Sequence, residues 1–219
     1  MILSLFLDSD DQRFFPPDAR AAICKVCDAT EPEVRALLPT LPATIELAAQ
    51  TGSFVIPETG EVGFAATPVR VNWTVDPSRP GGVAAVARAQ LRFTLFHELH
   101  HLVRGSVFRG GAPRTSFMDD VVSEGLATAF ERDAGGRLPP WGQYPQEASA
   151  WVAELLQLPL TAPYKHWMSQ HPDGRRWIGY RAGTYIADQA IAASGSSAAD
   201  LVLVPTAEIL RMAGVNDRK

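Results

Sequence analysis

The chain has 219 residues, and 46% of them are hydrophobic, which is enough for a sizeable core. Lysine and arginine number 20 against 24 aspartates and glutamates, so the net charge of −4 argues against a nucleic-acid or membrane-surface binder. No apolar run reaches the roughly eighteen residues of a membrane-spanning helix. Cys24 and Cys27 are the only cysteines, which excludes a disulfide scaffold and leads us to expect a cytoplasmic protein.

The first half of the chain mixes strand and helix patterns. In chain order they are a strand at 1–8, helices at 17–27 and 31–50, a small antiparallel sheet within 53–76 and a helix at 83–104. Thr30 is the expected N-cap of the second helix, and Gly105 ends the last one. The clearest strand is Val69–Val75, where apolar and polar residues alternate just before the last helix.

The second half is predicted to be helical. Its helices are expected at 118–134, 146–157, 178–194 and 206–214. The Gly- and Arg-rich loop 105–116 before them is a candidate for a mobile flap. The fold class is therefore α+β: residues 1–52 form an N-terminal strand and helices, and residues 53–219 a mostly helical region that carries the motif described next, together in one compact domain.

The most informative motif is His-Glu-x-x-His, formed by His97, Glu98 and His101. Positions four apart on a helix differ by ~40° in azimuth and ~6 Å in rise, so two imidazoles can converge on one tetrahedral zinc ion. Glu98, beside the first histidine, can then act as the general base on a water molecule at the metal. The leucines of this helix fall on the opposite side, which favours a metal site over a solvated helix face.

A catalytic zinc site needs a third protein ligand and one open position for water. A third histidine six residues after the second would stand at 107, where the chain has Val107. Glu124, on the next predicted helix, is the better source because its neighbours are largely apolar and a buried carboxylate requires a partner. Asp119 and Asp120 are the alternatives, although their place in the first turn of a helix also explains them.

These motifs resemble a known family. The His-Glu-x-His-His helix, the Glu-Gly-Leu-Ala helix from Glu124 and the segment Gly179–Tyr185 look like a family of zinc-dependent proteases of unknown function within the gluzincin group. The resemblance spans roughly 55–195 and implies a zincin-like core, Zn²⁺ as cofactor and metallopeptidase activity. One position departs from the pattern: Thr128 stands where several gluzincins carry an acid that supports a zinc-bound histidine.

Further polar residues are weaker candidates. His100 lies about 60° from His97 around the helix, so it either lines the cleft, supports the metal ligands or faces solvent. Arg181 is a candidate for contact with a substrate carboxylate, although a solvated arginine is the commoner case. For the donor that stabilises the oxyanion we favour Tyr180, with Tyr185 as the alternative, and both could also be structural.

The sequence therefore predicts a zinc-dependent peptidase, with peptide or protein substrates and no nucleic-acid or membrane partner. The alternating strand 69–75 precedes the metal-binding helix, so it is expected to form the edge of the cleft and to pair with an extended peptide. Two other functions stay open. One is a zinc hydrolase of a small non-peptide amide, and the other is a non-catalytic regulatory module that zinc only stabilises. A purely structural zinc site is normally closed by four protein ligands, and three good ones are present here.

Overall fold

The structure is a computed structural model, and it describes residues 2–7, 12–107 and 116–215. The chain divides into two compact units, Met1–Phe108 and Arg109–Lys219, and each is described by itself. The domain boundary expected at residues 52 and 53 falls inside the first unit. Most of the expected flap, residues 108–115, lies outside the described residues.

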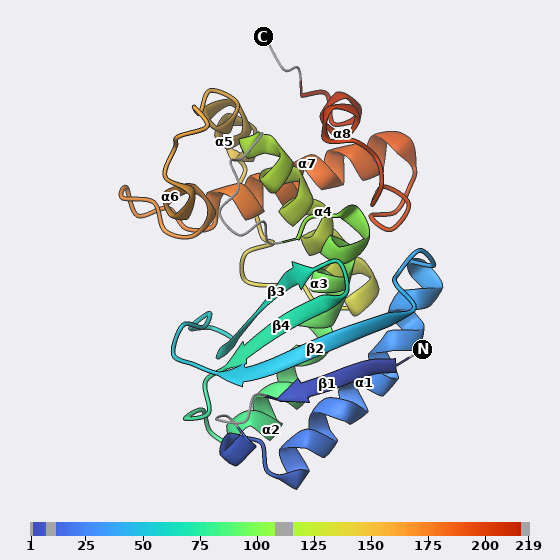
Figure 1. Ribbon diagram of the computed structural model, residues 1–219. Helices are drawn as coiled ribbons and strands as arrows, with labels where there is room; N and C mark the ends of the chain where they lie inside the picture. The colour runs from blue at the N-terminus through green and yellow to red at the C-terminus, as the bar shows by residue number, and fades with distance from the viewer. Residues whose placement is uncertain (1, 8–11, 108–115, 216–219) are drawn as a thin grey trace. The chain divides into compact units, whose positions relative to one another are not determined.

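The first unit is built on a four-stranded sheet with the order β1-β2-β4-β3 (Figure 1). Its strands are β1 (Ile2–Leu7), β2 (Thr44–Thr51), β3 (Glu61–Thr67) and β4 (Arg70–Val75). The β1–β2 and β2–β4 pairs are parallel, and only β3 and β4 are antiparallel. The antiparallel pairing predicted within residues 53–76 is confirmed for β3 and β4, and the parallel strands β1 and β2 make the whole sheet mixed. Strand β3 is an edge strand, and in the described part of the chain β4 is the one strand that pairs with it.

Residues 31–50 do not form the helix predicted for them. A single helix, α1 (Pro17–Leu37), continues through Thr30, which is therefore not an N-cap, and residues 44–51 form strand β2. Composition misled here, because Ala, Leu and Glu favour helices. In the fold, Ile45 and Leu47 are buried at alternate positions of a strand paired on both sides, and this packing overrides the local preference.

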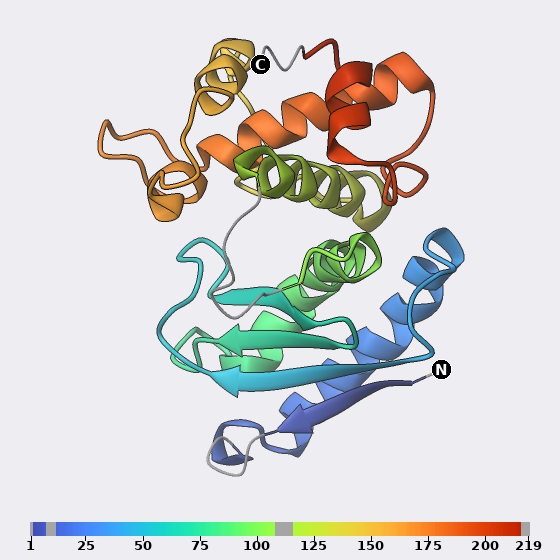
Figure 2. The same ribbon diagram turned by 45° about the horizontal axis from the view of Figure 1, so that its top comes forward.

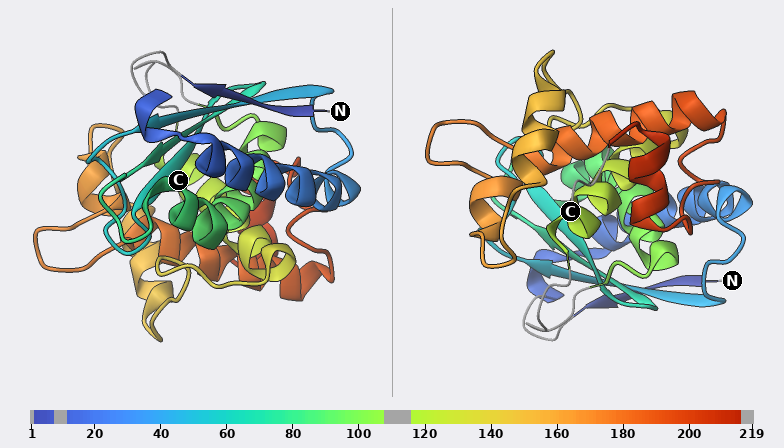
Figure 3. Two further views of the ribbon diagram at one scale, coloured as in Figure 1. Left: turned by 90° about the horizontal axis from the view of Figure 1, so that it is seen from below. Right: turned by 90° about the horizontal axis from the view of Figure 1, so that it is seen from above.

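The helices of the first unit gather on one face of this sheet (Figures 1 and 3). After β4 the chain forms α2 (Gly82–Val86), a π-helical turn (Ala87–Leu91) and α3 (Arg92–Arg104). This run corresponds to the predicted helix 83–104. It ends as expected at Gly105, whose φ of 76° is the left-handed conformation that glycine adopts readily. Helix and sheet bury a shared core that includes Ile23, Leu47, Trp73, Leu91 and Phe96.

The second unit is helical. It contains α4 (Phe117–Gly135), α5 (Ala148–Leu155), α6 (Tyr164–Met168), α7 (Ile178–Ser194) and α8 (Thr206–Met212). Helix α7 packs against each of the other four, and Figure 2 shows α4 and α7 side by side. The four predicted helices are present, and only the short α6 was missed. The α+β fold class, with a sheet preceding the histidine-bearing helix, is confirmed. No described helix is both long and apolar enough to cross a membrane.

Candidate metal centre

Helix α3 carries the two predicted zinc-binding histidines one turn apart. The His97 and His101 ring centroids lie 4.8 Å apart, with the ring planes at 73°. One ligand atom from each ring lies within 4.8 Å of the other. Both side chains are buried, with 6% and 5% exposed, so the pair is not a solvated surface patch. Two imidazole nitrogens at this spacing suit a tetrahedral zinc ion.

The donor chemistry of the described residues fits zinc. The residues that could hold one metal ion together are His97, His101 and Glu124. This group contains neither Asp119 nor Asp120, the alternatives left open by the sequence. Two histidines and one carboxylate leave the fourth position of a tetrahedral ion open, as in catalytic zinc sites. Glu124 lies in the middle of α4 and is partly exposed, whereas the flanking Ser123 and Gly125 are buried.

Glu98 is buried on α3, 7% exposed, beside the backbone of strand β3. A Cβ atom on Gly63 would collide with Cγ2 of Thr94 and would lie 3.0 Å from Cγ and 3.3 Å from Oε1 of Glu98. Only a glycine therefore allows the strand to come this close to the helix at this point. The end strand of the sheet and the predicted base are direct neighbours within the first unit.

Sequence reasoning missed Glu61, the first residue of β3. This carboxylate is 3% exposed, and its Oε2 accepts hydrogen bonds from Trp73 Nε1 and Thr94 Oγ1, both at 2.8 Å. The sequence holds a usable signal for it. Glu61, Gly63 and Ala65 are alternate residues of one strand and therefore lie on the same face of the sheet, and the other two of these three residues are small or apolar. An acid in the buried phase of a strand needs partners.

The two candidate tyrosines lie on α7 of the second unit. The Tyr180 ring packs against Trp141 and Trp177, with centroids 6.3 and 5.6 Å away. The Tyr185 ring packs edge-on against Tyr144 at 5.5 Å. Tyr144 in turn donates a hydrogen bond of 2.9 Å to Asp188.

His100 is fully buried, which removes the solvent-facing role considered for it. Arg181 is partly buried, and burial lowers the pKa of its guanidinium, with the neighbouring charge of Arg176 adding to the effect. Its guanidinium donates a long hydrogen bond of 3.5 Å to the carbonyl oxygen of Pro140. A role for His100 or Arg181 in supporting the metal ligands or the substrate stays a prediction.

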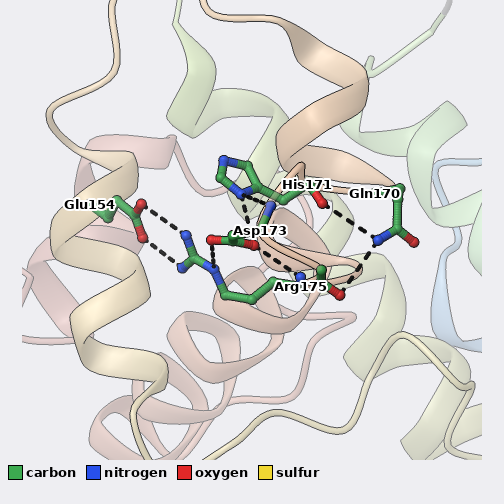
Figure 4. A network of polar contacts seen from close by, with 6 residues as sticks. Glu154, Gln170, His171, Asp173 and Arg175 are labelled. Atoms are coloured by element: carbon green, nitrogen blue, oxygen red, sulfur yellow. Dashed lines mark hydrogen bonds and ion pairs between the residues drawn. The ribbon is translucent and has the colours of Figure 1, made fainter.

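Arg175 belongs to an internal network of hydrogen bonds and ion pairs (Figure 4). Arg175 donates two hydrogen bonds to Glu154, at 2.7 and 3.0 Å, and a third of 2.8 Å to Asp173. Asp173 also pairs with His171 Nδ1 at 2.8 Å. Arg175 and His171 therefore tie the segment before α7 to α5, and this explains them without a substrate.

The two cysteines lie on α1 one turn apart, Cys24 exposed and Cys27 buried. Burial, followed by the nearby charges of Cys24 and Asp28, raises the pKa of the Cys27 thiol well above its usual range. A thiol held protonated in this way is a packing residue and a poor nucleophile.

Comparison with known proteins adds one finding. A family model described as "Predicted Zn-dependent protease (DUF2268)" matches residues 20–211 of the chain. Neither a curated protein nor a solved structure matches. The family match spans both units and includes all the candidate residues on α3, α4 and α7.

Proposed function

We propose that the chain, which belongs to this family of predicted zinc-dependent proteases, is a zinc peptidase in which Glu98 is the general base. His97, His101 and Glu124 are the proposed ligands. The observation that carries the proposal is the arrangement on α3, where two buried histidines one turn apart flank a buried glutamate.

Each residue has a distinct chemical task in this proposal. The histidine pair and Glu124 would hold the metal. When bound, the metal would act as a Lewis acid that activates water and polarises the scissile carbonyl. Glu98 takes a proton from the attacking water and delivers it to the leaving amine. Its buried position beside β3 limits competing water around the carboxylate.

The structure changes the expected place of the substrate. Residues 69–75 had been expected to pair with an extended peptide, but β4 already has β2 and β3 as neighbours, so that expectation was wrong. The corresponding edge belongs to β3. We therefore propose that an extended peptide adds to β3 by main-chain hydrogen bonds, which brings a peptide bond near Glu98.

Tyr180 is the proposed donor to the oxyanion formed when water attacks the carbonyl. A neutral phenol can donate a hydrogen bond without competing for the metal. Its ring packs against Trp141 and Trp177, which supports a fixed position for the hydroxyl. Tyr185 has a sufficient structural explanation in its contact with Tyr144.

The direct test is metal-dependent cleavage of a peptide library. Chelator-treated protein should be inactive, zinc should restore cleavage of long peptides, and Glu98→Gln should keep its zinc while kcat falls by a factor on the order of 10² or more. Turnover of small amides alone would favour the alternative hydrolase. Tightly held zinc without any turnover would favour a non-catalytic module.

A further inference from the structure

Glu61 is a buried carboxylate to which the mechanism above assigns no task. One of its oxygens, Oε2, accepts a hydrogen bond of 2.8 Å from Trp73 on β4 and another of 2.8 Å from Thr94 on α3. A single atom of β3 is thus bonded both to the neighbouring strand and to the histidine-bearing helix.

Keeping this carboxylate buried is energetically unfavourable. Desolvation raises the pKa of Glu61, and the negative charge of Glu98 raises it further. The hydrogen bonds from Thr94 and Trp73 offset only part of this effect. An apolar side chain would avoid the penalty, so the presence of a hydrogen-bond acceptor at this position requires a reason beyond packing.

The bond to Thr94 lies close to the candidate base. Thr94 is one helical turn before Glu98, and Gly63 is two residues after Glu61 on the same face of β3. A Cβ atom on Gly63 would meet the side chains of both Thr94 and Glu98. The Glu61–Thr94 bond therefore fixes strand and helix where the strand backbone passes the base.

We propose that Glu61 is a positioning residue that holds the edge strand β3 against α3, through Thr94, so that the backbone at Gly63 stays beside Glu98. This inference rests on the proposed function, in which Glu98 is the base and β3 receives the peptide. A displacement of about 1 Å between base and substrate can lower a rate by as much as a hundredfold. A bond that fixes this spacing therefore acts on kcat.

Four variants separate this role from general stabilisation. Thr94→Val keeps the side-chain shape but loses the hydroxyl donor, and Glu61→Leu loses the acceptor. Glu61→Gln keeps an oxygen that can accept both bonds. Trp73→Phe loses the other donor, which belongs to strand β4 and not to α3, and it also shrinks a fully buried side chain.

We expect kcat to fall on the order of 10-fold or more in Thr94→Val and Glu61→Leu. Glu61→Gln should restore kcat close to the wild-type value. Trp73→Phe should have the lowest melting temperature of the conservative variants and yet keep most of its kcat. Amide hydrogen exchange should rise over residues 61–67 in Thr94→Val and Glu61→Leu and stay unchanged in Glu61→Gln.

Two results would overturn the inference. The first is wild-type kcat together with wild-type exchange over residues 61–67 in Thr94→Val and Glu61→Leu. The second is a kcat that follows melting temperature through all four variants, because a purely structural residue behaves in this way. If the wild-type protein shows no metal-dependent cleavage, the proposed function fails. The exchange measurement then still decides whether Glu61 tethers β3 to α3.

Discussion

Gly125 on α4 and Gly183 on α7 meet backbone to backbone. A Cβ atom on Gly125 would overlap the carbonyl group of Gly183, and one on Gly183 would overlap the carbonyl oxygen of Val121. The contact is next to Glu124, so the two glycines set how closely α7 approaches the part of α4 that carries the proposed third ligand.

Gly183→Ala should therefore destabilise the protein and weaken zinc binding together. The new methyl group meets main-chain atoms that cannot rotate away, and overpacking of this kind costs about 1–3 kcal/mol. Melting temperature and zinc affinity should both fall. Gly179→Ala on the same helix is the matched control, since its methyl group would meet the flexible Met168 side chain, which can move. Equal losses in the two variants would contradict the explanation.

The metal ligands can be tested without any substrate. The purified protein should hold about one zinc per chain, and His97→Ala or His101→Ala should lose it on dialysis. Glu124→Ala should retain zinc more weakly. The exposed His166 supplies a control, because His166→Ala should keep the metal. Stoichiometric zinc in the double histidine variant would exclude this site, and unchanged affinity in Glu124→Ala would move the third ligand to Asp119 or Asp120.

A third prediction concerns Gly63→Ala. The added methyl group would collide with Thr94 Cγ2 and press on Glu98, so kcat should fall more than thermal stability does. Thr94→Ser removes the colliding methyl group while keeping the hydroxyl that bonds Glu61. The double variant should therefore recover part of the lost kcat. If Thr94→Ser brings no recovery, the loss does not come from this contact.

The pH dependence of stability should reveal the buried Glu61. Its pKa is raised above the ordinary 4.5, so between 4.5 and the raised value the folded protein binds more protons than the unfolded chain. Stability contributed by this group is present at low pH and is lost as the pH rises through the folded-state pKa. Glu61→Gln removes this loss, so its stability relative to wild type should increase from pH 4 upward. Urea unfolding of chelator-treated protein at several pH values measures it, and a constant difference would contradict the shift.

The candidate residues on α3 could be identified from the sequence because their signal is local. His97, Glu98 and His101 are fixed relative to one another by helix geometry alone. The long helices α4 and α7 were also predictable, since their periodic patterns end at glycines. A local pattern of this kind is readable without the rest of the fold.

The sheet was harder to predict from the sequence because its strand order depends on residues far apart in the chain. Residues 44–51 have the local composition of a helix, but they form a strand because β1 and β4 pair with them on both sides. Likewise, the alternation of the strand can mark Glu61 as a buried acid, but its hydrogen-bond partners Trp73 and Thr94 stand 12 and 33 residues away and are known only from the fold. Such long-range pairing leaves little trace in a single sequence.

The last prediction distinguishes the two tyrosines of α7. Tyr180→Phe keeps the ring that packs on Trp141 and Trp177 and removes only the hydroxyl. If that hydroxyl donates to the oxyanion, kcat should fall roughly 10- to 1000-fold with little change in zinc content or melting temperature. Tyr185→Phe should leave kcat unchanged, because its ring contact with Tyr144 survives and the Tyr144–Asp188 bond does not involve it. Tyr144→Phe is a further control that removes this bond and should lower stability alone. Steady-state kinetics of the three variants on one peptide substrate decide the matter. A wild-type kcat in Tyr180→Phe beside a depressed one in Tyr185→Phe would reverse the assignment, and wild-type values in both would leave the two tyrosines with structural roles only.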